Sequence, residues 1–451
     1  MSCVESENCY GCAACSLICP VDAIQMVENA EKFFVVQIDK SKCINCGKCL
    51  QVCPQKLNHK NKVLTSYAGY STDESILKQS SSGGMFGSFA KYLFNNSANV
   101  QVFAVKNDLG KVAYDVCTDY RDLERFYKSK YCQAFLNKSF YESLISAISN
   151  EAVCLIIGTP CILSGIKNTL LAQKAELTSC IFVDLVCHGV MSQSVYHTHL
   201  EECKKRWDGA VAEHYFRYKR SVTKDSPEGS RWNLYKVNDE IIIKKSDDDY
   251  YMQTYFADLA MRETCYCCQF TGTNRIGDIT IGDFNNAHLL CPQFDGLRSV
   301  SLVLANTDKG QSFIDKCNGN TVNLQPVDIK LLQKFNGPLT APIKRPFQRS
   351  LFHTQYMGTF GQIFACRQRL ERFLCHTAFR DDVIQGGAEF AGIVRDNDLR
   401  FRENPLHVAE GGPGADHGGQ YLGPVLGGRD GVFLRFDLRL QPTQKDIVAQ
   451  C

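Results

Sequence analysis

The chain has 451 residues, 24 of them cysteine, and its 50 basic and 48 acidic residues leave a net charge of +2. This length is enough for two or three domains that each bury a hydrophobic core. The near-neutral charge argues against general electrostatic binding to nucleic acid or to an anionic membrane. Cysteines spread along so long a chain also argue against a small secreted disulfide scaffold.

The beginning of the chain and its apolar runs give an expectation about location. Residues 1–19 are polar and cysteine-rich, without the apolar core of a signal peptide. The longest apolar runs, Val153–Ile157 and Ile181–Val186, are too short to cross a bilayer. We therefore expect a cytoplasmic protein without a membrane span, in a reducing compartment where thiols stay free for metal binding.

One cysteine pattern, Cys-x2-Cys-x2-Cys-x3-Cys-Pro, occurs twice in the first 54 residues. The pattern is typical of the ligands of two 4Fe-4S clusters, and the fourth cysteine of each copy then binds the other cluster. We therefore assign one cluster to Cys9, Cys12, Cys15 and Cys53. We assign the second cluster to Cys43, Cys46, Cys49 and Cys19.

Zinc and disulfides are the weaker interpretations of this doubled pattern. Zinc sites usually present two separated Cys-x2-Cys pairs, and disulfides suit small secreted chains. Residues 1–55 are accordingly predicted to form a small two-cluster domain of the bacterial ferredoxin type, followed by a polar linker at residues 55–62.

Residues 63–360 are predicted to form a second, mixed α/β domain, so that the fold class of the whole chain is α+β. Apolar periodicity predicts helices after Gly84, at Phe140–Ile148 and at Ile162–Leu171. Short β-branched runs predict strands at Val100–Val105, Val153–Ile157, Ile181–Val186, Ile276–Phe284 and Val300–Ala305. Polar residues and cysteines follow several of these strands, which is where ligands of α/β folds bind.

Four dispersed cysteines form a second set of candidate ligands. Cys161 and Cys187 each follow a predicted buried strand, and Cys265 and Cys268 form a Cys-x2-Cys pair. If the fold brings them together, four thiolates suit a third 4Fe-4S cluster. Inert buried thiols and a zinc site are the alternatives that the sequence leaves open.

Three segments are candidates for binding the phosphate or ring of a cofactor. Ser82, Gly83 and Gly84 precede a predicted helix, whose N-terminus attracts anions. Gly158, Thr159 and Pro160 end a predicted strand. Lys130 is a candidate to pair with a phosphate or with an anionic reduced flavin, and a solvated surface lysine is the alternative.

Charged residues surround the predicted strand near the Cys265 and Cys268 pair. Arg275 and Asp278 are candidate cofactor residues, and a structural ion pair in this segment is an equally good explanation. No Gly-x-Gly-x-x-Gly motif follows a strand, so the sequence does not support a Rossmann nicotinamide site. No catalytic residue is assigned.

The end of the chain differs in composition from the rest. Twelve glycines fall within residues 386–431, without a sustained period of 2 or 3.6 residues. Such a segment has few apolar faces to bury. We expect residues 366–451 to be a poorly ordered tail, which an altered reading frame could have produced.

Several stretches of the second domain, in this order, resemble the coenzyme F420 (deazaflavin) hydrogenase/dehydrogenase beta-subunit family. They are SSGGMFGSFAKYL (81–93), SKYCQA (129–134), GTPCILSGIKNTL (158–170), DLVCHGV (184–190), RETCYCCQF (262–270), RIGDITIGDF (275–284) and NT-x-KG (306–310). With the ferredoxin-like start, the resemblance covers residues 1–360. The chain departs from the family at Ala134, where serine is usual, and at Ile162, where glutamine is usual.

The resemblance implies an iron-sulfur flavoprotein oxidoreductase, with FAD or FMN beside the clusters. Its partner would be a redox protein or a soluble electron carrier. Two other functions stay open: an electron-transfer subunit without a substrate of its own, and a redox accessory protein of capsule or exopolysaccharide biosynthesis, because some family members are encoded with such genes.

Overall fold

The structure is a computed structural model, and it describes residues 4–56, 59–108, 110–219, 232–284, 287, 291, 293–294 and 299–353. The predicted tail at residues 366–451 and the last residues of the predicted second domain lie outside this part of the chain. Among the described residues, no helix is both long and apolar enough to cross a membrane.

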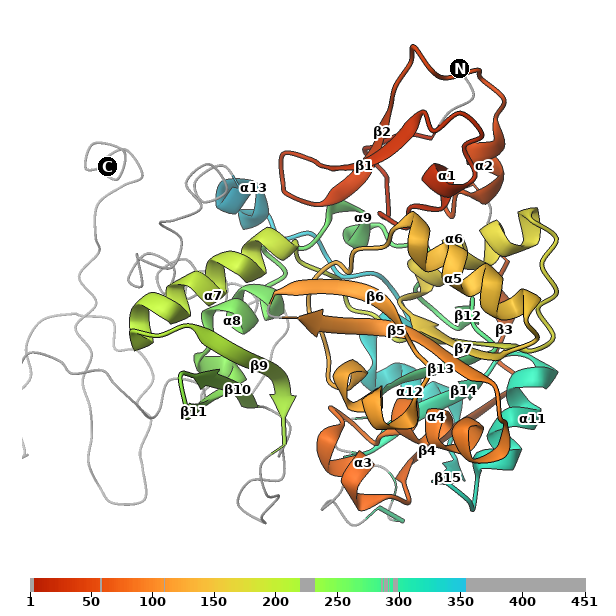
Figure 1. Cartoon of the computed structure of the whole chain (residues 1–451). Coiled ribbons are helices and arrows are strands. Elements are labelled where there is room, and N and C mark those ends of the chain that lie inside the picture. Colours follow the sequence, from red (N-terminus) through yellow and green to blue (C-terminus); the bar gives the residue numbers. More distant parts are fainter. Residues whose placement is uncertain are drawn as a thin grey trace, which may run out of the picture. The chain divides into compact units, whose positions relative to one another are not determined.

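The cysteine-rich start folds into two short helices and one hairpin (Figure 1). Helix α1 (Ala14–Leu17) precedes the antiparallel strands β1 (Ile24–Glu28) and β2 (Phe34–Ile38), and α2 (Lys48–Val52) follows them. The residue before each helix, Ala13 or Gly47, has a left-handed backbone with φ of 56° or 71°. This reversal lets each run of cysteines curl around one point, because an extended run would spread its thiols apart.

An eight-stranded mixed sheet forms the centre of the larger part of the chain. Its strand order is β15-β4-β14-β13-β8-β7-β5-β6. The inner strands β5, β7, β8 and β13 run parallel, and antiparallel strands extend the sheet on both sides. In chain order the eight strands are β4 (Thr65–Ser71), β5 (Val100–Asp108), β6 (Lys111–Cys117), β7 (Val153–Gly158), β8 (Cys180–Leu185), β13 (Ile279–Asp283), β14 (Ser301–Ala305) and β15 (Val322–Pro326).

Helices cover both faces of this sheet. Helices α4 (Met85–Asn96) and α11 (Asp308–Cys317) pack on one face, and α5 (Lys138–Ser149) and α6 (Pro160–Ala172) on the other. Strand β7 shows why both faces need cover: Leu155 contacts the first layer and Ile156 the second, since neighbouring side chains of a strand point to opposite faces. The predicted mixed α/β domain is thereby confirmed.

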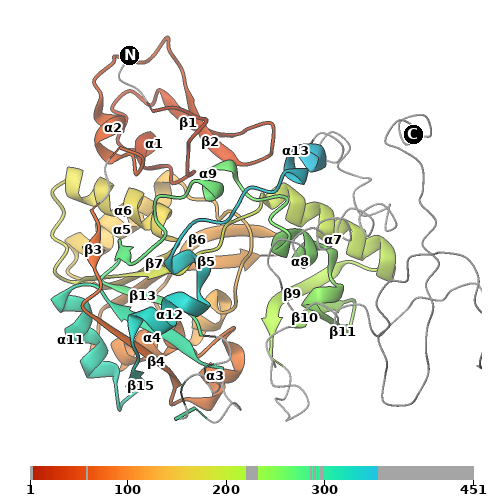
Figure 2. The same cartoon turned by 180° about the vertical axis from the view of Figure 1, so that it is seen from behind.

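The cysteine-rich unit packs on the layer formed by α5 and α6, as Figures 1 and 2 show from opposite sides. Tyr141 of α5 donates a hydrogen bond to the carbonyl of Cys12 at 2.8 Å. Gln133 bonds both the amide and the carbonyl of Phe34, at 2.8 and 3.0 Å. Hydrogen bonds between side chains of the sheet domain and the backbone of Cys12 and Phe34 therefore hold the cysteine-rich unit against that domain.

A second, three-stranded antiparallel sheet has the order β11-β10-β9 and lies beside two helices. Its strands are β9 (Val211–Tyr218), β10 (Trp232–Val237) and β11 (Glu240–Lys245), and the helices are α7 (Gln193–Trp207) and α8 (Tyr250–Phe256). The remaining elements are short: β3 (Asn61–Lys62), α3 (Glu74–Gln79), η1 (Tyr120–Phe126), η2 (Ser246–Asp248), α9 (Glu263–Tyr266), β12 (Asn274–Arg275), α12 (Ile329–Phe335), η3 (Gly337–Leu339) and α13 (Gln348–Phe352).

Candidate functional site

The thiols of Cys9, Cys12, Cys15 and Cys53 come together in the structure. Burial raises the pKa of Cys15, and the neighbouring thiols of Cys12, Cys9 and Cys53 raise it further. Burial also raises the pKa of Cys12, with contributions from Cys9 and Cys53. The fourth cysteine of the second copy thus lies near the first three of the first copy, and the crossed assignment stays a prediction.

The second group lines one hollow at the surface. Its lining includes the four thiols of Cys19, Cys43, Cys46 and Cys49, together with Val21, Ile24, Ile38 and Ile44. Cys46 is exposed, whereas Cys49 is buried. The structure therefore also brings together the second crossed set, and it places that set nearer to solvent than the first.

The four dispersed cysteines converge as well. Burial raises the pKa of Cys187, and the thiols of Cys265, Cys161 and Cys268 add to the effect. Burial raises the pKa of Cys268 to about 12, with Cys161 as the next cause. The ends of β7 and β8 lead into Cys161 and Cys187, and α9 with the turn after it supplies the pair, so distant segments meet at one place.

Arg262 and Tyr10 lie between the first and the third cysteine group. The guanidinium of Arg262 donates to the carbonyl of Tyr10, and its second nitrogen lies 3.8 Å from the sulfur of Cys161. Burial alone would lower the pKa of Arg262, but the thiols of Cys265, Cys161 and Cys9 raise it. This buried cation, only 6% exposed, therefore interacts with thiols of both groups.

The chemistry of these thiols fits iron-sulfur clusters. Among the described residues, no three His, Cys, Asp or Glu side chains are placed to hold a single metal ion. A cluster makes a different demand, because its four cysteines bind a group of irons instead of one centre. Burial disfavours free thiolates here, and bonding to a metal is what would keep such thiols deprotonated.

A cavity of about 650 Å³ lies at the carboxyl ends of β7, β8 and β13. This volume is in the range of cofactor and small-ligand sites. Cys187 and Arg262 are part of its lining, so the cavity borders the third cysteine group. Tyr131, Met252 and Tyr255 contribute apolar surface to it.

One end of the cavity is polar and basic. Ser82 and Gly84 line it at the start of α4, where Gly84 takes a left-handed φ of 83° that favours glycine. Lys128 and Lys130 also line it. Lys219 donates to the carbonyl of Leu77 at 2.7 Å and contacts the carbonyl of Ser82, so it belongs to the same end.

The three lysines are partly buried, and none of them has a carboxylate as an ion-pair partner among the described residues. Burial lowers the pKa of Lys130 to about 7 and that of Lys128 to about 8. Burial, with the charges of Lys128 and Arg217, lowers the pKa of Lys219 to about 7. In the described part of the chain none of these ammonium groups forms an ion pair, whereas Arg217 is paired with Asp283. An anion bound here would offset the cost of burying them.

The predicted cofactor residues divide into two sets. Ser82, Gly84, Lys130, Gly158 and Thr159 line the cavity. The other four are not part of its lining: Gly83, Pro160, Arg275 and Asp278. The amide of Gly83 donates to the hydroxyl of Ser301 at 2.9 Å, and Pro160 is the first residue of α6.

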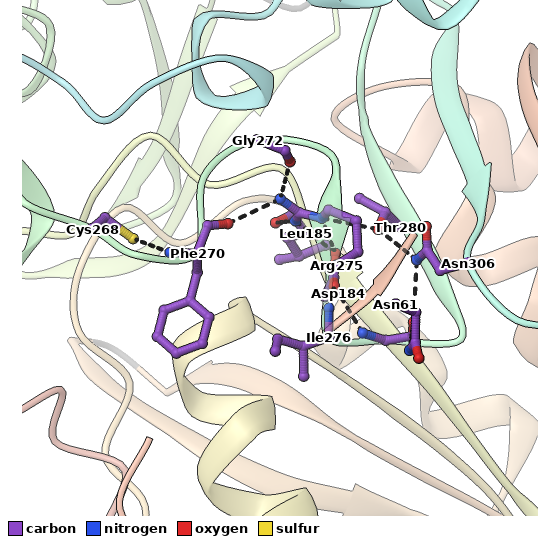
Figure 3. A network of polar contacts seen from close by, with 11 residues as sticks. Asn61, Asp184, Leu185, Cys268, Phe270, Gly272, Arg275, Ile276, Thr280 and Asn306 are labelled. Atoms are coloured by element: carbon purple, nitrogen blue, oxygen red, sulfur yellow. Dashed lines mark hydrogen bonds and ion pairs between the residues drawn. The ribbon is translucent and has the colours of Figure 1, made fainter. Parts of the chain in front are cut away.

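Arg275 and Asp278 have partners within the protein, which favours the structural ion pair over the cofactor role that the sequence also allowed. Figure 3 shows the Arg275 side chain against the carboxylate of Asp184, at 2.7 Å, with carbonyls of Leu185, Phe270 and Gly272 around it. Asp278 accepts from the amide of Phe182 and pairs with Lys309 at 3.2 Å. Both side chains join strands of the sheet and are engaged within the protein.

Several residues of the site were not predicted from the sequence. Lys128, Arg217 and Lys219 come from loop and strand positions without a recognisable motif. His188, the residue after Cys187, lines the cavity and lies 2.6 Å from the carboxylate of Asp258. Arg262 precedes the Cys265 pair within the RETCYCC stretch, which was the one signal that could have marked it.

Comparison with protein families adds three matches. Residues 8–57 match a 4Fe-4S dicluster domain, and a second dicluster family matches residues 35–134. Residues 152–330 match the family that is described as the C terminus of the coenzyme F420 hydrogenase/dehydrogenase beta subunit.

Known relatives match parts of the chain. The B subunit of an ion-translocating oxidoreductase complex from Methanosarcina acetivorans is 44% identical over 49 residues, 11% of this chain and 17% of that protein. The coenzyme F420-dependent sulfite reductase of Methanocaldococcus jannaschii is 25% identical over 168 residues, 37% of this chain and 26% of that protein. The chain thus spans about a quarter or less of the length of these two relatives.

Two further similarities are to a small ferredoxin and to a solved structure. The 7Fe ferredoxin of Hydrogenibacillus schlegelii is 36% identical over 73 residues, 16% of this chain and 87% of the ferredoxin. A chain of the F420-reducing [NiFe] hydrogenase complex from Methanosarcina barkeri aligns with a TM-score of 0.43 and 15% identity, over 63% of this chain and 91% of that one. The chain therefore carries a ferredoxin-type 4Fe-4S dicluster domain, and its residues 152–330 match the C-terminal part of coenzyme F420 hydrogenase/dehydrogenase beta subunits.

Proposed function

We propose that this protein is an iron-sulfur flavoprotein that passes electrons between its N-terminal clusters and a flavin in the cavity. Cys9, Cys12, Cys15 and Cys53 would hold the first cluster, and Cys19, Cys43, Cys46 and Cys49 the second. Cys161, Cys187, Cys265 and Cys268 would hold a third. When bound, the flavin supplies the exchange between one-electron and two-electron transfer.

The observation that carries this proposal is the order of the cysteine groups. Cys15 of the first group and Cys49 of the second belong to one cluster of buried side chains, and Cys12 of the first and Cys161 of the third belong to another. Cys187 of the third group borders the cavity. The second group, with its exposed Cys46, is the entry or exit at the surface. Each group thus has a neighbour, which is what stepwise electron transfer needs.

The basic end of the cavity supports a phosphate-bearing cofactor. The start of α4 attracts anions through its backbone, and Lys128, Lys130 and Lys219 add positive charge beside it. FMN and FAD both end their ribityl chain in phosphate, so either would place that group here. The apolar surface of Tyr131, Met252 and Tyr255 would then face the ring.

The composition of anaerobically purified protein tests the proposal. About twelve iron and twelve acid-labile sulfide atoms, with one flavin, are expected for each chain. About eight iron and eight sulfide atoms with one flavin would refute only the third cluster. Zinc without labile sulfide would contradict the whole assignment.

The second candidate is an electron-transfer subunit that serves a partner enzyme. It is favoured by the exposed second group and by a relative that is named as part of an oxidoreductase complex. Such a protein would contain the same cofactors but turn over only with its partner. The role in polysaccharide synthesis stays a prediction from the resemblance.

A further inference from the structure

The rim of the second cysteine hollow combines exposed apolar side chains with a candidate redox centre. Ile44 is 60% exposed and Val21 is 36% exposed, and both line the hollow beside the exposed Cys46. Most of the Ile44 side chain faces water, so its burial contributes little to the stability of the fold. Apolar side chains kept at the edge of a reactive site are typical of a surface that another molecule covers.

Lysines lie in the hollow and in the stretch of chain that leads into it. Lys48 lines it, and Lys40 and Lys42 are exposed in the stretch just before Cys43. Residues 40–48 contain no carboxylate. The two nearest acids in sequence are balanced, since Asp39 lies 3.6 Å from Lys42 and Asp22 lies 3.6 Å from Lys138. The side chains of this stretch other than the cysteines, counted with Asp39, therefore keep an excess of two positive charges, outside the negative charge that a thiolate-bound cluster would bring.

We infer that this basic rim, made of Val21, Lys40, Lys42, Ile44 and Lys48, is the docking surface for an acidic protein electron carrier. The inference rests on the proposed function, because it needs a redox centre behind the rim. Opposite charge speeds the encounter of such partners and orients them, while apolar contacts at the centre hold them. One electron moves between the carrier and the centre at Cys19, Cys43, Cys46 and Cys49, so one is oxidised and the other reduced, and no bond or proton is exchanged.

Charge also decides against a second copy of this chain as the occupant. Two copies meeting through this surface would bring like charges together, which costs association energy. A small cationic dye is disfavoured for the same reason, although it can still reach an exposed cluster. An acidic protein is the partner that can form favourable charge contacts with the lysines and an apolar contact with Ile44 at the same time.

The test compares charge-reversal variants of the full-length, cluster-loaded protein. Lys48→Glu and Lys40→Glu alter the basic rim, and Lys32→Glu is the matched control, because Lys32 is an exposed lysine of the β1–β2 turn paired with Glu28. The probe is a purified acidic two-cluster ferredoxin. Binding of its oxidised form is measured by calorimetry, and electron transfer from its reduced form is measured by stopped-flow, at low and high salt.

We expect Lys48→Glu and Lys40→Glu to weaken binding and to slow electron transfer by about tenfold at low ionic strength. The difference should shrink above about 0.5 M salt, where charges are screened, and Lys32→Glu should resemble the wild type. Ile44→Ser should weaken binding at both salt concentrations. Iron and sulfide content, with reduction by methyl viologen, shows that each variant still holds its clusters.

Three outcomes overturn the inference while leaving the proposed function intact. The ferredoxin fails to bind a wild-type protein that methyl viologen can reduce, or Lys48→Glu and Lys32→Glu have equal effects. The third outcome is a concentration-dependent dimer that Ile44→Ser abolishes. Failure of the proposed function looks different. The wild type would then lack iron and sulfide, and methyl viologen would not reduce it.

Discussion

At the scale of single residues, Arg262 is the cation that links two cysteine groups. It is buried, it contacts the carbonyl of Tyr10 and it lies 3.8 Å from the sulfur of Cys161. A positive charge next to a cluster favours the reduced form, which carries one more negative charge. Arg262 is therefore a positioning and tuning residue in the proposed electron path.

Arg262→Gln should lower the reduction potential of the third cluster by on the order of 100 mV, whereas Arg262→Lys should lower it less because the charge remains. Potentiometric titration followed by electron paramagnetic resonance measures this shift. Arg345→Gln is the control, since Arg345 is a partly exposed arginine that pairs with Glu263 of α9. An unchanged potential in Arg262→Gln would show that the charge does not act on a cluster.

Asp184 and Arg275 form a buried ion pair, with side chains 0% and 1% exposed. Asp184→Asn leaves the arginine charge buried without its partner and should reduce the free energy of unfolding by about 3–5 kcal/mol. Glu201→Gln breaks an exposed pair with Lys204 and should cost less than about 0.5 kcal/mol. Denaturant unfolding measures both, and equal effects would refute the structural role given to the pair.

Sequence patterns predicted the residues whose roles depend on local spacing. Cys9 to Cys19 and Cys43 to Cys53 follow a pattern that reflects the geometry of one tight loop. The sequence left Arg275 undecided between a cofactor role and an ion pair, because its partner Asp184 is 91 residues away and reaches it only through the pairing of β8 with β13. Lys219 and Arg217 were missed for the same reason, since β9 meets the α4 turn only in the folded chain.

At the scale of elements, the start of α4 and the lysines beside it should make phosphate binding depend on pH. The pKa of Lys130 and of Lys219 is lowered to about 7, and that of Lys128 to about 8, each mainly by burial. These groups therefore lose their protons between about pH 6 and 9 in the absence of an anion. A bound phosphate raises their pKa values, so its binding takes up protons and weakens as the pH rises.

The affinity for FMN should thus fall about tenfold or more from pH 6 to pH 9. Riboflavin, which lacks the phosphate, should show a much smaller change and serves as the matched ligand. Fluorescence titration of flavin-depleted protein gives both affinities. Lys219→Met should remove part of the FMN dependence, and parallel pH profiles for the two flavins would contradict a phosphate site at this end of the cavity.

The inner elements of the sheet were predictable, and the outer ones were not. Val153–Ile157 and Ile181–Val186 were expected as strands and form β7 and β8, because strands buried on both faces are continuous apolar runs. The edge strands β6 and β15 alternate polar and apolar residues over short lengths, as exposed segments also do. Strands β9 and β10 lie on either side of residues 220–231, where Pro227 and Gly229 are turn signals, but neither strand was among those predicted.

At the scale of the whole molecule, the contact of α6 with the first cysteine loop joins the two parts of the chain. A Cβ on Gly165 would lie 2.6 Å from the sulfur of Cys12 and 3.4 Å from Pro54. Gly165→Ala should therefore push the loop away, lower the free energy of unfolding by about 1–3 kcal/mol and release iron. Gly337→Ala, where a Cβ meets no atom within 4 Å, is the control. Full iron content in Gly165→Ala would show that the loop does not need this contact.

The central claim is that the three cysteine groups deliver electrons to a flavin in the cavity. It is tested most directly by the rate of flavin reduction in cluster-loaded protein, with reduced acidic ferredoxin as the donor. In Cys161→Ser, which removes a ligand of the group bordering the cavity, we predict a small fraction of the wild-type rate, while direct photoreduction of the same bound flavin stays normal. Flavin reduction by the ferredoxin at the wild-type rate in Cys161→Ser would contradict the account.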